Sequence, residues 1–318
     1  MAHDEPTAAC DTALVFPGMG PASFADVGRF MVANRYAREL VDIADETLGY
    51  SLVDAFRQAE GDYSEAAQVA FFVNCLASAY WARDHLGVEP DLITGPSFGE
   101  KAAVAYSGAL PMADAVRLTA QIARCLDEYF AQEHRDIVTL SFVRTPQDRL
   151  DEIRAELDDA GEWHEISCYV DEGFYMISLA ERRVEWMEKR LRAIGGMPLY
   201  TMRPPMHASA FGPLRDKAER EVLSAYTFAD PEQTVVADQD GALLRTGEEL
   251  RTMLLDSFVR PLNWPSVTTA LKAAGVRRVC VAGPDSLFGR VPCTTRNFEV
   301  IAAHPRLAMT PRRPSRAA

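Results

Sequence analysis

Short apolar runs alternate along this chain with longer stretches whose apolar residues recur at helical spacing. The short runs predict buried strands at residues 13–16, 91–94, 234–237 and 279–282. Helical patterns fill most of the chain up to about residue 130 and return at 213–226, 247–257 and 265–274. Because strands and helices alternate in this way, we predict an α/β fold whose core is a mainly parallel sheet.

The rhythm changes between residues 136 and 203. Strand patterns lie at 137–143, 164–170, 174–179 and 197–202, and amphipathic helices lie at 146–159 and 181–194. The order β-α-β-β-α-β is that of a ferredoxin-like unit. We therefore predict a large α/β-hydrolase-like core, residues 1–135 and 204–307, with a small ferredoxin-like domain inserted at 136–203. Residues 308–318 are rich in proline and arginine and are predicted to form a disordered tail.

Composition and charge narrow the class of protein. The 318 residues carry a formal net charge of −13, which argues against nucleic acid or a membrane surface as a partner. Six scattered cysteines have no paired spacing and predict reduced thiols, with neither a disulfide framework nor a metal site. The first residues lack a signal-peptide pattern, and the longest apolar run, Val69–Ala82, is too short to span a bilayer. We expect a cytoplasmic monomer.

A G-x-S-x-G motif at residues 95–99 stands where a strand pattern gives way to a helical one. This context is typical of a nucleophile elbow, in which a sharp turn lifts the hydroxyl of Ser97 above the sheet edge. A serine hydroxyl needs a neighbouring base. Of the six histidines, His207 lies where the chain returns from the inserted domain to the core, and it is the candidate base. The others are interpreted as solvated or capping residues: His3, His85, His134, His164 and His304.

Six segments in order resemble the malonyl-CoA:acyl carrier protein acyltransferase family, which includes the acyltransferase domains of polyketide synthases. They are residues 16–20, 95–100, 109–118, 205–207, 260–264 and 282–284. The first two resemble the family's F-P-G-Q-G opening and its G-H-S-x-G-E elbow, and the fourth resembles the segment that carries the catalytic histidine. The resemblance covers roughly residues 12–300, and the family also has an inserted ferredoxin-like unit.

The resemblance implies a serine–histidine dyad that performs ping-pong acyl transfer. Ser97 would attack a thioester while His207 takes its proton, and a second thiol would then release the acyl group from the serine. The backbone N–H groups of Met19 and Phe98 match the oxyanion-hole positions, and the carbonyl of Asn263 would orient the imidazole. No cofactor is implied, because the acyl groups travel on the phosphopantetheine of carrier proteins.

Departures from the family pattern bear on the substrate. Malonyl-type members carry an arginine on the helix after the elbow, and the matching position here is Ile122. Because an isoleucine cannot hold a carboxylate, we predict a non-malonyl acyl group. The alternative is a shifted helix that lets Arg124 serve. Pro96, in place of the family's histidine, and Met206, beside the candidate base, are predicted to shape the same substrate pocket.

Relatives in macrolactam polyketide pathways move aminoacyl or dipeptidyl groups between carrier proteins, and we expect such a role in antibiotic biosynthesis. The acidic pair Asp171 and Glu172 is either a site for a substrate ammonium or an ordinary solvated turn. Three alternatives stay open: an editing hydrolase of acyl-carrier thioesters, an acyl-CoA:carrier protein transferase and a non-catalytic carrier-binding protein.

Donor and acceptor carrier proteins are the expected partners. Because carrier proteins are acidic along their docking helix, the enzyme needs a local basic surface. The candidates for docking are arginines of the inserted domain and of the C-terminal region: Arg149, Arg154, Arg182, Arg183, Arg190, Arg290 and Arg296.

Overall fold

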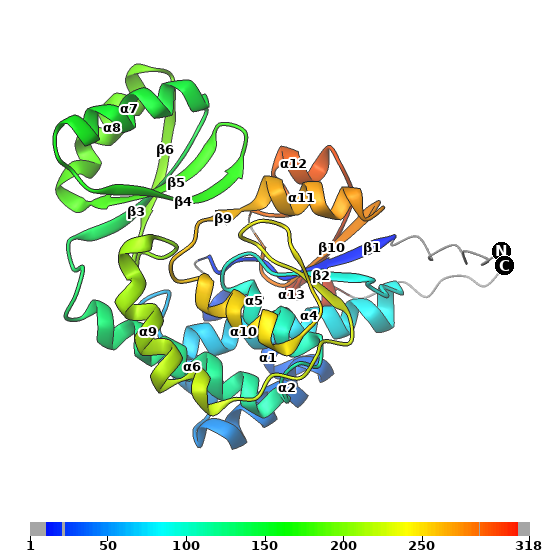
Figure 1. Cartoon of the computed structure of the whole chain (residues 1–318). Coiled ribbons are helices and arrows are strands. Elements are labelled where there is room, and N and C mark those ends of the chain that lie inside the picture. The colour runs from blue at the N-terminus through cyan, green and yellow to red at the C-terminus, as the bar shows by residue number, and fades with distance from the viewer. Residues whose placement is uncertain (1–10, 21–22, 286, 311–318) are drawn as a thin grey trace, which may run out of the picture.

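The computed structural model describes residues 11–20, 23–285 and 287–310, and it contains two sheets (Figure 1). The first sheet has six strands in the order β11-β10-β1-β2-β7-β8. These are β1 (Thr12–Val15), β2 (Leu92–Thr94), β7 (Thr234–Val236), β8 (Leu243–Leu244), β10 (Arg278–Ala282) and β11 (Glu299–Ala303). Every neighbouring pair is parallel except β7–β8. The predicted mainly parallel sheet is confirmed, while β8 and β11 are strands that we did not predict.

Side chains alternate between the two faces of this sheet, and each face has its own core. Leu14 packs on one face with helices from the N-terminal half of the chain, here called the first group. Its neighbours Ala13 and Val15 pack on the opposite face with α11 (Trp264–Ala273). The first group comprises α1 (Phe24–Ala33), α2 (Arg35–Leu48), α3 (Leu52–Gln58), α4 (Glu65–Leu86), α5 (Gly99–Tyr106) and α6 (Met112–Phe130). The opposite face is covered by α11 (Trp264–Ala273) and α12 (Pro292–Thr295) (Figure 1). The elements α9 (Gly212–Glu221) and α10 (Gly247–Asp256) pack on α6 and α5.

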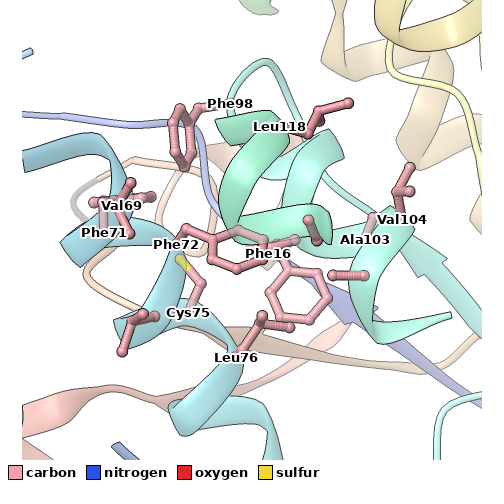
Figure 2. Packing of buried hydrophobic residues seen from close by; sticks show 14 of the residues in the cluster. Phe16, Val69, Phe71, Phe72, Cys75, Leu76, Phe98, Ala103, Val104 and Leu118 are labelled. Atoms are coloured by element: carbon pink, nitrogen blue, oxygen red, sulfur yellow. The ribbon is translucent and has the colours of Figure 1, made fainter. Parts of the chain in front are cut away.

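Helix α4 is buried on nearly all its faces, which explains why its sequence is apolar all round. Figure 2 shows Phe72 of α4 lying beside Phe16 in the packed region between α4 and α5. Both rings are fully buried. Among the residues that the structure describes, no helix is long and apolar enough to cross a membrane.

The second sheet belongs mainly to residues 137–202 and has the order β6-β3-β5-β4-β9. Its strands are β3 (Ile137–Val143), β4 (His164–Asp171), β5 (Phe174–Ala180), β6 (Met197–Met202) and β9 (Leu262–Asn263). Helices α7 (Gln147–Asp159) and α8 (Val184–Ala193), the latter preceded by a short 3-10 turn (Glu181–Arg183), complete the β-α-β-β-α-β order. We call residues 137–202 the second unit; it has a hydrophobic core of its own.

Strand β9 ties the second unit to the rest of the chain. It comes from the core, pairs parallel with β4, and aligns Leu262 with Cys168 and Asn263 with Tyr169. Within the second unit, by contrast, the neighbouring strands are antiparallel. Strand β9 was not predicted, because two residues are too few to show a periodicity.

The predicted start of a disordered tail at residue 308 is wrong for the residues that the structure describes. Helix α13 (Pro305–Ala308) packs against the core, and so does Met309. The apolar side chains of this short segment therefore have a place to be buried. Residues 311–318 lie outside the described residues, as do His3 and Cys10.

Candidate active site

The backbone around Ser97 turns so tightly that both motif glycines are needed for space. A Cβ on Gly95 would lie 2.2 Å from the carbonyl carbon and oxygen of Gly99, and a Cβ on Gly99 would lie 2.0 Å from the carbonyl oxygen of Phe16. Ser97 itself has φ 54°, in the left-handed region that non-glycine residues rarely adopt. It lies between the end of β2 and the start of α5. The G-x-S-x-G motif thus forms a strained turn that presents the serine.

The side chains of Ser97 and His207 meet although they are 110 residues apart in sequence. The Oγ of Ser97 lies 2.7 Å from Nε2 of His207. His207, like Ser97, has a left-handed backbone, with φ 62°. It follows β6 and precedes the short 3-10 turn Ser209–Phe211, so the loop that leaves the second unit carries it back to the sheet edge. The arrangement is that of a nucleophile and its general base.

Burial sets the protonation of the imidazole. His207 is 9% exposed, and its desolvation lowers its pKa to about 4, while backbone hydrogen bonds with Ser257 and Arg260 oppose the shift. The ring is therefore neutral near pH 7 and can accept a proton. Asn263 hydrogen-bonds elsewhere: its side chain accepts from Ser266 N–H at 3.1 Å. Its role in orienting the imidazole stays a prediction.

Met19 and Phe98, the predicted oxyanion donors, both line the cavity in which Ser97 lies. Within residues 11–20, 23–285 and 287–310, neither of their backbone N–H groups donates to a protein acceptor. Unpaired N–H groups at a cavity wall are free to bind a developing oxyanion.

A pair of buried carboxyl groups, which the sequence analysis missed, lies behind the nucleophile. Asp238 and Glu100 are 1% and 2% exposed and are hydrogen-bonded to each other. Asp238 Oδ2 accepts the backbone N–H of Ser97 at 2.5 Å, and Glu100 Oε1 accepts from Gln239 Nε2 at 2.8 Å. Burial raises the pKa of Glu100 well above its usual range and that of Asp238 to about 6. A hydrogen bond between two carboxyl groups requires that one of them be protonated, and burial favours protonation of both.

A signal for Asp238 was present in the sequence. It follows the strand pattern at 234–237, and Ser97 follows the one at 91–94. Those strands, β7 and β2, are parallel neighbours. Because the carboxyl ends of parallel strands meet at one edge of a sheet, a polar residue after β7 lies beside the elbow.

The cavity has one wall on the core and one on the second unit. The second unit contributes Thr139, Ser167, Cys168, Met176, Tyr200 and Met202. Of the three predicted pocket residues, Met206 lines the cavity, but the described lining includes neither Pro96 nor Ile122. Ile122 is 2% exposed and packs into the core, and Leu126, one helical turn further along α6, faces the cavity instead. Two of the three assignments to the pocket were therefore wrong.

Lys101 is a cavity residue that the sequence analysis did not single out. It lies on the first turn of α5, four residues after Ser97, and lines the same cavity. Its ammonium Nζ lies 4.4 Å from the centroid of the Phe98 ring. The sequence spacing from Ser97 carried no usable signal, because Ser97 precedes α5 and has a left-handed backbone.

Other predicted residues are engaged elsewhere. Arg124 makes a bidentate ion pair with Glu65, with Nε–Oε2 at 2.5 Å and Nη2–Oε1 at 2.8 Å, and it does not line the described cavity. Asp171 accepts the backbone N–H groups of Glu172 and Cys293 at 2.7 and 2.9 Å. Neither Asp171 nor Glu172 lines the described cavity. In the described part of the chain no three His, Cys, Asp or Glu side chains cluster as a metal site would require.

Most of the candidate docking arginines already pair with acidic side chains of the second unit. Arg149 pairs with Glu152, Arg154 with Asp151, Arg182 and Arg183 with Glu162, and Arg190 with Glu156. Arg290 and Arg296 differ, because neither has an ion pair within the described residues. The free positive charge of the candidate set thus lies on the core rather than on the second unit.

Comparisons with known proteins agree with this site. The acyl transferase domain family matches residues 13–158, and the VinK acyltransferase small domain family matches residues 141–202. The malonyl CoA-acyl carrier protein transacylase of Bacillus subtilis (strain 168) is 25% identical over 300 residues, covering 91% of this chain and 92% of the relative. A non-reducing polyketide synthase of Aspergillus ustus is 27% identical over 286 residues, covering 86% of this chain but 13% of that protein.

The fold is also similar to that of solved transacylases. One is a malonyl-transacylase in complex with the acyl-carrier protein of a type II PKS, with a TM-score of 0.80 and 22% identity. The match covers 92% of this chain and 95% of the transacylase.

Proposed function

We propose that this chain is an acyltransferase similar to the malonyl-CoA:acyl carrier protein transacylases, which it matches over residues 13–202 and at 25% identity, and that Ser97 and His207 are the dyad that transfers its acyl group. The observation that supports this most directly is the 2.7 Å contact between Ser97 Oγ and the neutral His207 Nε2 at a cavity wall.

The reaction has two half-reactions of the same kind. Ser97 Oγ attacks the carbonyl carbon of an acyl thioester while His207 Nε2 takes the hydroxyl proton. The C–S bond then breaks, and the departing thiolate receives that proton, which leaves an acyl-serine. A second thiol loses its proton to His207 and attacks the ester, and Ser97 leaves with the proton restored. The N–H groups of Met19 and Phe98 stabilise the oxyanion in both halves.

We propose carrier proteins as donor and acceptor; this is supported by a solved malonyl-transacylase of similar fold that is in complex with an acyl-carrier protein. The finer fold assignment is also a proposal. We place residues 136–203 in the ferredoxin-like class on the β-α-β-β-α-β order, and the remainder in the α/β-hydrolase-like class on the elbow and the parallel sheet.

The acyl group is proposed to be other than malonyl, with an aminoacyl or dipeptidyl group of a macrolactam pathway as the candidate. Two observations support this. No arginine lines the described cavity, since Ile122 stands in the core and Arg124 is held by Glu65. The second unit matches the VinK acyltransferase small domain family rather than a general one.

Intact mass spectrometry of the protein after incubation with a panel of acyl- and aminoacyl-carrier thioesters tests this function. An adduct of the acyl mass is expected on wild type and not on Ser97→Ala. Addition of a second holo-carrier protein should remove the adduct and acylate the carrier. Release of free acid instead would identify an editing hydrolase, and absence of any adduct would contradict acyl transfer. A malonyl adduct formed faster than all others would overturn the substrate assignment alone.

A further inference from the structure

The acyl cavity contains an ammonium group that no protein carboxylate neutralises. Two formally charged side chains line the described cavity, Lys101 and Asp285. The carboxylate of Asp285 accepts the backbone N–H groups of Leu287, Phe288 and Gly289 at 2.9–3.0 Å, so it is occupied with holding its own loop. None of the ion pairs or side-chain hydrogen bonds of the described residues includes the ammonium of Lys101.

Its sequence neighbour Glu100 opposes the fall in the Lys101 pKa through its charge, but no hydrogen bond or ion pair joins the two side chains among the described residues. Glu100 Oε1 accepts from Gln239 Nε2 instead, and Asp238 accepts the backbone N–H of Ser97. The contact that Lys101 does make is with the face of the Phe98 ring, at 4.4 Å from the centroid. A ring face stabilises a cation but leaves all three N–H donors without an acceptor.

Lys101 also lies close to the reacting atoms. It lines the cavity beside Ser97 and His207, and its charge is near enough to the imidazole to contribute to lowering the pKa of His207. Burial lowers the pKa of Lys101 itself to about 8, so the ammonium form still prevails at pH 7. A half-buried ammonium with unused donors favours a ligand that brings an oxygen acceptor.

We propose that Lys101 is a specificity-determining residue that donates to an oxygen acceptor carried by the acyl chain, and that it excludes an acyl group with a free ammonium at that place. The proposal rests on acyl transfer at Ser97 and narrows its substrate class. Because the acyl group is proposed to be other than malonyl, the acceptor is a neutral amide carbonyl. An aminoacyl group therefore enters with its amine acylated or placed away from Lys101.

The test compares four pantetheine thioesters that share a three-carbon acyl chain. Propionyl has no acceptor, 3-acetamidopropionyl has an amide carbonyl, malonyl has a carboxylate and β-alanyl has an ammonium. The rate of acyl-Ser97 formation by intact mass spectrometry gives kcat/KM for each. For wild type we expect 3-acetamidopropionyl to exceed propionyl by about tenfold or more, malonyl to react more slowly than 3-acetamidopropionyl, and β-alanyl to fall below propionyl.

In Lys101→Met the advantage of the acceptor-bearing groups should disappear, propionyl should change less than twofold, and β-alanyl should improve. Lys101→Arg should keep part of the discrimination, because it keeps the charge. Lys272→Met is the matched control, since this exposed lysine of α11 bonds Asn297 at 3.1 Å and does not line the cavity. A higher kcat/KM for malonyl than for 3-acetamidopropionyl would contradict a neutral acceptor.

Two outcomes would overturn the proposal. An equal loss for all four thioesters in Lys101→Met would mean that the ammonium stabilises the oxyanion instead, and an unchanged ranking would mean that it contacts no acyl group. Failure of acyl transfer itself is separable, because non-transferable amide analogues of the same four compounds can be bound to wild type and Lys101→Met in calorimetry. Equal affinities of the two proteins for every analogue would contradict the role of Lys101 whether or not Ser97 is acylated.

Discussion

The two walls of the cavity are held in place in different ways. On the core side, Ser97 is fixed by hydrogen bonds to groups that are almost fully buried, Asp238 and through it Glu100. The second unit has its own core and joins the rest of the molecule through the short β4–β9 pairing (Figure 1) and through Cys168, Val170 and Met176, which pack with the first sheet and α11. Its strand β6 is largely exposed, with Tyr200 44% accessible beside the cavity. The core wall therefore holds the nucleophile, whereas the wall of the second unit contributes the more exposed part of the lining.

Replacement of Asp238, which holds Ser97 on the core side of the cavity, should have the largest effect on stability and on the rate of acylation. Asp238→Leu removes the acceptor of the Ser97 N–H and leaves Glu100 without its partner. We expect the free energy of unfolding to fall by about 2–3 kcal/mol and acyl-Ser97 formation to fall by at least tenfold. Urea unfolding and intact mass spectrometry measure the two effects.

Asp238→Asn is the control for this prediction, because its amide oxygen can still accept from Ser97. It should lose less of both stability and rate. If the leucine variant matched wild type in both measurements, the buried pair would have no part in holding the elbow.

The pH dependence of acylation tests the effect of burial on the pKa values of His207 and Asp238. His207 must be neutral to accept a proton, and burial lowers its pKa to about 4, so kcat/KM should fall tenfold per pH unit only below about pH 4. A smaller decrease near pH 6 is expected from protonation of Asp238, whose pKa burial raises to about 6. This decrease should be absent from Asp238→Asn.

Stability should follow the same groups. The depressed folded pKa of His207 makes its contribution to stability fall as the pH drops from its ordinary value of 6.5 to about 4. The raised folded pKa values of Asp238 and Glu100 contribute with the opposite sign in that window, so Asp238→Asn should show a steeper loss of stability toward low pH than wild type. Circular dichroism checks that the protein is folded at each pH. A single rate inflection near pH 6.5 in both wild type and Asp238→Asn would contradict a desolvated imidazole.

The smallest expected effects concern carrier docking, and they compare the two units directly. Arg290 and Arg296 belong to the core and lack ion pairs within the described residues, whereas Arg149 is paired with Glu152 at 2.8 Å. Arg290→Glu and Arg296→Glu should raise the KM for an acyl-carrier protein severalfold at low salt and leave pantetheine thioesters unaffected. Arg149→Glu should change neither. Equal losses with carrier and pantetheine substrates would remove these residues from a docking surface.

Much of the fold could be predicted from periodicity. The strands into Ser97 and before Asp238 and the β-α-β-β-α-β order appear in the structure within a few residues of their predicted bounds. Three strands were missed: β8 and β9 have two residues each, whereas β11 has five. The two-residue strands exist because neighbouring strands pair with them, and two residues show no pattern of their own.

The pocket could be predicted less well. Matching the positions of α6 to a family pattern does not show which face of the helix lies toward the cavity. Ile122 matched the family's arginine position but points into the core, and Leu126 lines the cavity. Lys101 escaped notice because a lysine on the first turn of a helix is usually a solvated residue. Only the packing of Phe98 and the second unit around it encloses its ammonium.

The sequence by itself determined the elbow, since two glycines and a strand–helix junction leave the backbone little choice around Ser97. It also determined the parallel sheet and the separate rhythm of the second unit. Only the tertiary structure decided what surrounds the nucleophile. His207, Asp238 and Lys101 come together with Ser97 because parallel strands end at one edge and the loop from β6 returns there. Burial at that edge then sets the charge of each group, and burial is a property of the packed chain and not of its local sequence.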